Sequence, residues 1–281
     1  MKSKNMSKIL MDNILYICLL LMIVIIAIIS PSFISVRVLS DVLTQSAPKM
    51  LLAVGMLVVI IAGGMDMTVG RLAGLGAVVS GTLAQQSTYY IKFWPSLPEM
   101  PLIVPIVASI IIGIISGVIT GLIISKLKVP AFLAGLGLQL IIYGGNLLFM
   151  KKAPNNSQPL AGFKESFTKF GTGSVAGVNY LIIVALVVMI AVYIILNMTT
   201  LGKNIYATGG NREAAKVAGI NVFKIDMFVY ILSGALAALA GCMLAARTGS
   251  ANATYAEGYE MDAIAATALG GTSMSGGRGK I

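Results

Sequence analysis

The stretch Gly63–Arg71, with the sequence GGMDMTVGR, interrupts a run of apolar residues, and Gly270–Arg278, GGTSMSGGR, echoes it near the other end of the chain. Six of the nine positions match at one constant offset, and one of these six pairs a threonine with a serine. A Gly-Gly pair readily ends a helix because glycine adopts a positive φ without steric cost. We therefore expect two helices, each broken by a polar segment; these segments are called the first and the second knuckle.

Both knuckles have the composition of a substrate pathway. Lipid cannot satisfy the backbone groups that a broken helix frees, so such breaks occur only inside protein or beside a wet cavity. Repeated halves with interrupted helices point to a transport site, whereas the alternative is two helix corners that share glycines by chance. The predicted pathway residues are Gly63, Gly64, Asp66, Thr68, Gly70, Arg71, Gln139, Asn146, Ser273 and Ser275.

Asp66 has two open roles, contact with a substrate or capping of the helix that follows, as Ser273 can do in the second knuckle. An ionised aspartate near the centre of the bilayer costs about 2.5–3.5 kcal/mol. Asp66 is therefore expected to face water or a partner such as Arg71.

The composition is that of a membrane protein, because 57% of the 281 residues are hydrophobic, 11% are charged and the mean hydropathy is +0.92. The net charge of +10 does not indicate nucleic-acid binding, since the cations lie between apolar runs and form no dense patch. The sequence contains no histidine, and Cys18 and Cys242 lie inside apolar runs. This argues against zinc sites, histidine-based catalysis and a disulfide, so we expect a chain that is not an enzyme.

Eight apolar runs predict an all-α fold, a polytopic transmembrane helix bundle with broken helices and an internal repeat whose copies begin near 46 and 253. The alternative for one or two of these runs is a re-entrant segment that enters the bilayer and returns to the same side. The basic start, without a small-residue cleavage site, predicts an uncleaved anchor with a cytoplasmic N-terminus. The runs cover about 14–29, 47–62, 72–84, 101–124, 131–150, 180–197 and 227–245, and one starts near 263.

Alternation from a cytoplasmic start places both knuckles on one side and the aromatic loop 85–100 outside. The repeats are then parallel, but a re-entrant hairpin would invert them, and both arrangements stay open. Two glycine stripes are expected to be helix-packing seams. They contain Gly113, Gly117 and Gly121 in one run, and Ser233, Gly234, Ala237 and Gly241 in another.

The longest expected cytoplasmic stretch is 199–226, and it predicts a short helix of about two turns. So short a helix is unstable alone in water, so it needs its own membrane domain or a partner protein to lie against. A solvated connector is the alternative. The residues that define the predicted short helix are Gly209 and Gly210 (a turn before it), Asn211 (the cap), Glu213 (in the first turn), Ala214, Ala215 and Ala218 (a smooth flank), and Gly219 (the end).

Three strings resemble the sugar-importing ABC permeases of the ribose, xylose and galactose type: GGMDMTVG at 63–70, GKNIYATGGNREAAKVAGI at 202–220 and GYEMDAIAATALGGTSMSGGRG at 258–279. The resemblance covers nearly the whole chain. The pair Gly-Arg at 70–71 and the string Pro-Ala-Phe that begins at Pro130 favour the galactose/methyl-galactoside type. It implies one transmembrane permease domain over 1–281, in a homodimeric pore in the bilayer of a bacterial cell membrane. In this family an ATP-binding subunit docks on the cytoplasmic face of the permease, and an extracytoplasmic sugar-binding protein delivers the sugar.

The resemblance also assigns the segment 209–219 as the coupling segment that touches the ATPase, with Glu213, Ala214, Ala215 and Gly219 matching its EAA-x-x-x-G core. No phosphate-binding loop is present in the sequence, so ATP is expected to bind the partner subunit. This chain itself is expected to bind no cofactor. Relatives of this type continue to about ten spans, so the chain is expected to be C-terminally truncated. The alternative function is an ion-coupled secondary carrier for a small polar solute, which would need intramembrane carboxylates as relays.

Overall fold

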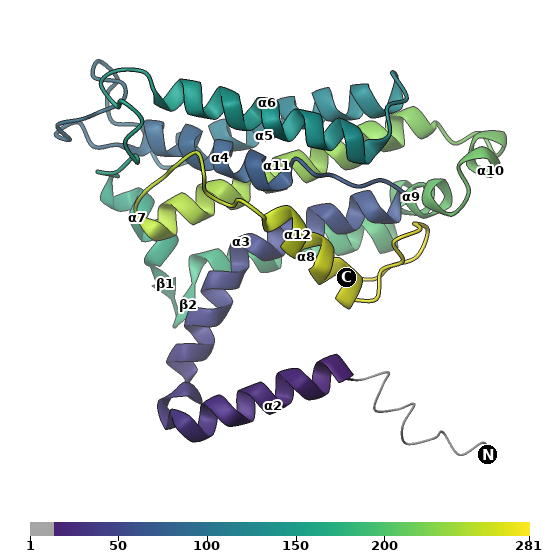
Figure 1. Cartoon of the computed structure of the whole chain (residues 1–281), viewed down its shortest axis with the longest axis horizontal. Coiled ribbons are helices and arrows are strands. Elements are labelled where there is room, and N and C mark those ends of the chain that lie inside the picture. Colours follow the sequence, from purple (N-terminus) through teal and green to yellow (C-terminus); the bar gives the residue numbers. More distant parts are fainter. Residues whose placement is uncertain (1–13) are drawn as a thin grey trace. The chain divides into compact units, whose positions relative to one another are not determined.

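The structure, a computed structural model, describes residues 14–281 (Figure 1). Lys2, Lys4 and Lys8, on which the expected cytoplasmic N-terminus rests, lie outside the described residues. The chain divides into two compact units, Met1–Leu43 and Thr44–Ile281. Helices make up most of the described residues of both units, which agrees with the all-α prediction.

The described part of the first unit contains an apolar helix, a short turn and the start of a longer helix. Helix α2 (Ile14–Ile29) has the bounds of the first apolar run. The 3-10 helix η1 (Pro31–Phe33) follows, with Pro31 in its first turn, where the missing N–H costs no hydrogen bond. Most large apolar side chains of α2 are exposed, as expected for a helix that faces lipid.

The second unit holds the other helices and one antiparallel hairpin, in which Ser174 pairs with Asn179. Helix α3 (Val36–Ile61) begins in the first unit. The remaining elements are α4 (Val69–Ala84), α5 (Ile103–Ser125), α6 (Ala131–Met150), α7 (Glu165–Thr172), β1 (Ser174–Val175), β2 (Val178–Asn179), α8 (Tyr180–Met198), α9 (Thr200–Gly210), α10 (Arg212–Val217), α11 (Val222–Thr248) and α12 (Tyr259–Leu269).

All eight predicted apolar runs form helices, but length separates them into two classes. Among the described residues five helices, α3, α5, α6, α8 and α11, are long and apolar enough to cross a membrane. Helices α2 and α4 have 16 residues each and α12 has 11, so the expected eight spans become five by length. Helix α3 starts well before the predicted residue 47, because Arg37 and Asp41 hide its first turns from a search for apolar runs.

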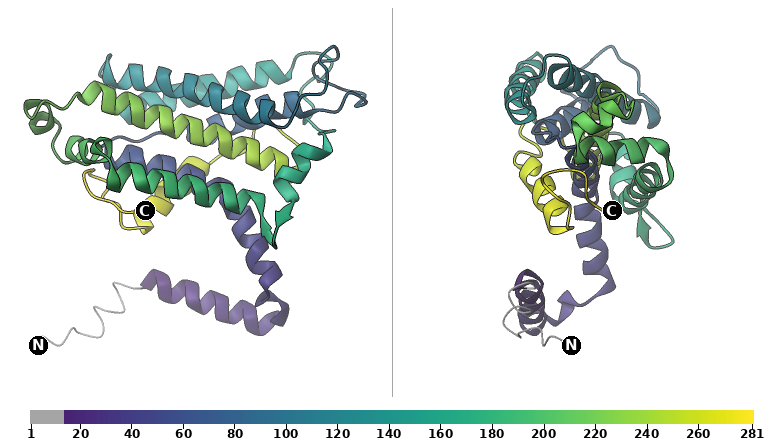
Figure 2. Two further views of the ribbon diagram at one scale, coloured as in Figure 1. Left: turned by 180° about the vertical axis from the view of Figure 1, so that it is seen from behind. Right: turned by 90° about the vertical axis from the view of Figure 1, so that its right-hand side faces the viewer.

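Helix α11 is the central element of the second unit, packed along α5 and α4 (Figure 2). The predicted glycine seams are confirmed there. A Cβ at Gly113 would lie 2.3 Å from the carbonyl oxygen of Gly234, and one at Gly241 would lie 1.8 Å from that of Ala73. Only glycine allows the helix backbones to approach this closely.

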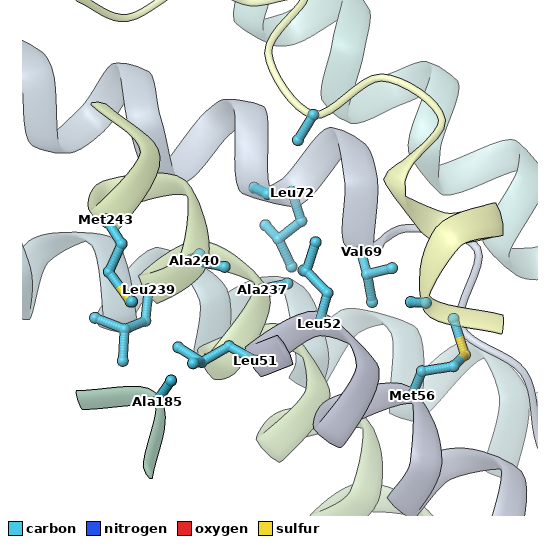
Figure 3. Close-up of a cluster of buried hydrophobic side chains, with 14 of the residues drawn as sticks. Leu51, Leu52, Met56, Val69, Leu72, Ala185, Ala237, Leu239, Ala240 and Met243 are labelled. Carbon is cyan, nitrogen blue, oxygen red and sulfur yellow. The ribbon is translucent and has the colours of Figure 1, made fainter. Parts of the chain in front are cut away.

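The main apolar core lies where α3, α4, α8 and α11 meet (Figure 3). Leu51 and Leu52 from α3 and Leu72 from α4 are fully or almost fully buried against small residues of α11, among them Ala237 and Ala240. This core fixes the end of α3 and the start of α4, between which the first knuckle lies.

Candidate translocation and coupling site

The first knuckle begins with a helix end stabilised by backbone hydrogen bonds. Gly63 has a φ of +83°. Its N–H donates to the carbonyl of Ile60 at 2.9 Å, and the N–H of Gly64 donates to that of Val59 at 2.9 Å. This pair of bonds is a Schellman motif, which needs a left-handed residue at Gly63. The Gly-Gly pair therefore ends α3 as the sequence predicts.

The second knuckle repeats this helix end with a shift of one residue. The left-handed residue is Gly271 (φ +84°), whose N–H donates to the Ala268 carbonyl, while the N–H of Thr272 donates to the Thr267 carbonyl. Sequence matching pairs Gly63 with Gly270, so the structural counterpart lies one position later. The polar segment after the glycine is one residue shorter in the second knuckle for this reason.

The polar side chains downstream of the two glycines also correspond. The N–H of Thr68 donates to Asp66 Oδ1 at 3.0 Å, and the N–H of Ser275 donates to Ser273 Oγ at 3.3 Å. Both are side-chain turns that span two residues. Asp66 thus binds the backbone of Thr68, the N-cap residue of α4, and does not itself cap the helix, which begins at Val69 without a side-chain cap. The prediction that Ser273 caps a following helix is wrong for the described residues, because no helix forms within 274–281, so the second knuckle follows a helix without interrupting one.

The partner of Asp66 is Ser233 of α11 and not Arg71. Asp66 is 1% exposed, and its carboxylate accepts hydrogen bonds from the hydroxyl groups of Thr68 at 2.6 Å and Ser233 at 2.7 Å. Arg71 instead donates to Glu257 Oε1 at 2.7 Å and lies over the Tyr143 ring. Sequence reasoning missed the Asp66–Ser233 contact, since it assigned Ser233 no hydrogen-bonding role.

This arrangement predicts that hydrogen bonding, and not charge, is what position 66 requires. Asp66→Asn keeps an acceptor for Thr68 and offers an N–H to the Ser233 oxygen, so we expect protein level and transport near those of the parent. Asp66→Ala leaves three donors without an acceptor, at about 1.5–3 kcal/mol for each bond to a charged group, and should lower the melting temperature sharply. Thermal unfolding in detergent and solute uptake measure both outcomes. Normal amounts of an inactive Asp66→Asn protein would show that the charge acts in transport.

The other predicted pathway residues lie around α4 and α6. Tyr143 and Asn146 are on one face of α6, and Gln139 is partly buried one turn earlier. Asn146 is 1% exposed, yet neither polar atom of its side chain has a hydrogen-bond partner among the described residues. Gly70 allows the Glu260 carboxylate to approach α4, because a Cβ there would lie 2.0 Å from Oε2. Whether these residues contact a substrate stays a prediction.

The segment 199–226 folds into two short helices before α11. Gly209 and Gly210 do not form the expected turn, because they are the last residues of α9. The break comes at Asn211, whose side chain accepts from the N–H of Ala214 at 2.9 Å and caps α10 as predicted. Glu213 lies in the first turn, and its bond from the Lys216 ammonium group holds the pKa of its carboxyl group below the ordinary value.

Helix α10 presents a different face from the predicted one. Ala215 is buried, so the three alanines do not share a flank. Every other residue of α10 is exposed; Ala214, Val217 and Ala218 are the apolar members of this outward face, next to the charged Arg212, Glu213 and Lys216, and Val217 is 90% exposed. Sequence reasoning missed Val217. Its apolar side chain, two residues before the helix-ending Gly219, was the available signal.

Gly219 ends α10 with a third Schellman motif. Its φ is +83°, and the N–H of Ile220 donates to the Ala215 carbonyl at 3.0 Å. A Cβ at Gly219 would meet nothing within 4 Å, so the constraint there is backbone conformation and not space.

Gly219→Val should therefore loosen the end of α10, because a left-handed β-branched residue costs on the order of 1–2 kcal/mol. We expect trypsin to cleave after Lys216 roughly tenfold faster, the factor that corresponds to about 1.4 kcal/mol. Gly219→Asn is the control, since asparagine tolerates this conformation, and it should be cleaved at nearly the parent rate. Equal cleavage rates for both variants would show that the helix end does not depend on Gly219.

Three segments far apart in sequence meet at backbone contact where α9 ends. The N–H of Gly277 donates to the Ile61 carbonyl at 2.9 Å. A Cβ at Gly209 would lie 1.7 Å from the same carbonyl oxygen, and one at Gly276 would lie 2.9 Å from the Cα atom of Gly63. We call this contact of Ile61–Gly63, Gly209–Gly210 and Gly276–Gly277 the glycine junction. It joins the residues before α10 directly to both knuckles.

A family model described as branched-chain amino acid transport system / permease component matches residues 38–277. The galactose/methyl galactoside import permease protein MglC of Salmonella typhimurium is 38% identical over 271 residues, which cover 95% of this chain and 80% of that protein. The ribose import permease protein RbsC is 38% identical over 275 residues in Escherichia coli K12 (97% of this chain, 81% of that protein). Its Bacillus subtilis counterpart is 36% identical over 269 residues (95% and 78%).

No solved structure matches the chain. The family model covers far more than half of the residues, and the relatives match along nearly all of the chain. The chain, a multi-pass membrane protein, therefore belongs to the family of branched-chain amino acid transport system permease components.

Proposed function

We propose that the chain is the transmembrane subunit of an ABC importer for a monosaccharide, of the galactose/methyl-galactoside or ribose type. Relatives named as import permeases for these sugars support the substrate class. The pathway would be formed by the knuckles together with α4 and α6, in a homodimer in a bacterial cell membrane.

The observation that carries this proposal is the exposed, capped helix α10 next to the glycine junction. A helix of six residues is unstable alone, but α10 is held at both ends and exposes Ala214, Val217 and Ala218 on its outward face, beside its charged residues. Such a face suits a groove on a separate ATP-binding subunit, which would bind the ATP. The N-terminus then lies in the cytoplasm with α10, and an extracytoplasmic sugar-binding protein docks on the opposite side.

The geometry suggests how motion would pass from α10 to the pathway. Closure of the ATP-binding subunits would displace α10 and the end of α9. The backbones are in direct contact at the glycine junction, so a displacement of Gly209 would also displace both knuckles. The chain itself would act as a passive gate that opens alternately to each side.

Reconstitution of the chain with its ATP-binding subunit and sugar-binding protein tests the proposal. We expect uptake of labelled galactose or ribose into vesicles that contain ATP, and none with a non-hydrolysable ATP analogue. Uptake by the chain alone, driven by a proton or sodium gradient, would instead show an ion-coupled carrier and overturn the proposal.

A further inference from the structure

A cavity of about 540 Å³ lies beside α10. Its walls come from α10, the end of α3, the end of α5, the start of α6 and the start of α11. This volume falls within the roughly 300–1,000 Å³ of small-molecule sites in proteins. The lining of the cavity includes Gly64, Ser125, Lys128, Arg212, Asp226 and Tyr230, together with the Glu213–Lys216 pair of α10.

The charged side chains of the cavity suit a neutral ligand rich in hydroxyl groups. Arg212 pairs with Asp226, and Lys216 pairs with Glu213, so most of the charge is neutralised locally. Paired groups of this kind still offer N–H donors and oxygen acceptors to a ligand. Lys128 adds one ammonium group that has no ion pair within residues 14–281.

A buried hydroxyl group in the cavity wall needs a hydrogen-bond acceptor. Tyr230 is 2% exposed, and its hydroxyl proton has no acceptor in the described part of the chain. The hydroxyl oxygen approaches the first knuckle, since a Cβ at Gly64 would lie 2.5 Å from it. A buried donor left unpaired is unfavourable, so a ligand that accepts this bond is favoured.

The cavity therefore lies between the first knuckle and α10. We propose that it binds a neutral monosaccharide on the side where the sugar is released, through Tyr230 and the paired charges of Arg212 and Asp226. This inference rests on the proposed function. Because α10 forms one wall, movement of α10 would change the shape of the site and release the sugar.

Protection of an introduced thiol locates the ligand. Ser125→Cys, in a Cys18→Ser background, places a thiol in the wall; Cys242 is fully buried and should not react. The complete complex in inside-out vesicles is treated with a hydrophilic maleimide and rising D-galactose or D-ribose. We expect saturating sugar to slow labelling at least about tenfold. Lys224→Cys, which is exposed and outside the cavity lining, should label at an unchanged rate.

The second variant tests the hydroxyl group itself. Tyr230→Phe, combined with Ser125→Cys, should raise the half-protecting sugar concentration about threefold to tenfold, as expected for one lost hydrogen bond. Tyr193→Phe, which removes an exposed hydroxyl group on α8, should not change it.

The outcomes separate the two proposals. If the complex imports sugar with ATP but neither sugar protects Ser125→Cys, this inference is wrong and the proposed function stands. Protection by inorganic phosphate in place of sugar, or protection unchanged by Tyr230→Phe, also overturns it. If the complex imports no sugar, both the proposed function and the sugar site in the cavity are wrong.

Discussion

Gly209→Ala should stop coupled uptake by the proposed importer while the ATP-binding subunits continue to hydrolyse ATP. The added Cβ would lie 1.7 Å from the carbonyl oxygen of Ile61 and 2.8 Å from the backbone nitrogen of Gly277. Both neighbours are backbone atoms, so no side-chain rotation relieves the overlap. The end of α9 must move away from both knuckles, and the path by which α10 would move them is lost.

The expected size of the effect follows from the cost of overpacking. Inserting a methyl group into a well-packed contact costs about 1–3 kcal/mol, or roughly a fivefold to 150-fold change in an equilibrium. Uptake should fall by at least tenfold, whereas ATP hydrolysis by the reconstituted complex should stay within about twofold of the parent, because α10 still folds and docks.

Gly210→Ala is the matched control for this prediction. It adds the same methyl group to the next residue of α9, where a Cβ would meet nothing within 4 Å and φ is not positive. Alanine also has a higher helix propensity than glycine, so the variant should be at least as stable as the parent. Equal uptake by the Gly209→Ala and Gly210→Ala proteins would show that the glycine junction does not transmit the motion.

The features that sequence reasoning predicted correctly depend on residues close together in the chain. Gly63 and Gly219 end their helices as expected, and Asn211 caps α10, because each motif is complete within six residues. The glycine seams were also predictable. A row of small residues at four-residue spacing is visible in the sequence, and it permits close approach of another helix.

The features that were missed depend on tertiary packing. Ser233 lies far along the chain from Asp66, and no local pattern marks it as the partner of that carboxylate. The phase of α10 was also hidden, because a helix of six residues with adjacent alanines has no hydrophobic periodicity to show that Ala215 faces inward. The shift of the second knuckle to Gly271 appears only in its hydrogen bonds, since its sequence offers two adjacent glycines.

Val217→Asp should abolish association with the ATP-binding subunit without affecting the fold of the chain. The Val217 side chain is 90% exposed, so the unbound chain loses no packing when it changes. In a docked complex the new carboxylate would be buried in an apolar groove without a partner, which costs several kcal/mol.

The expected result is an affinity for the ATP-binding subunit at least about 100-fold weaker, equivalent to roughly 2.7 kcal/mol, measured by co-purification and titration in detergent. Val217→Ala removes only two methyl groups and should weaken binding about tenfold, at about 0.8 kcal/mol for each buried group. Thr200→Asp is the matched control, since it adds the same charge at an exposed position of α9 away from the α10 face, and it should bind normally. If Val217→Asp bound as tightly as Thr200→Asp, the outward face of α10 would not be the surface that the ATP-binding subunit recognises.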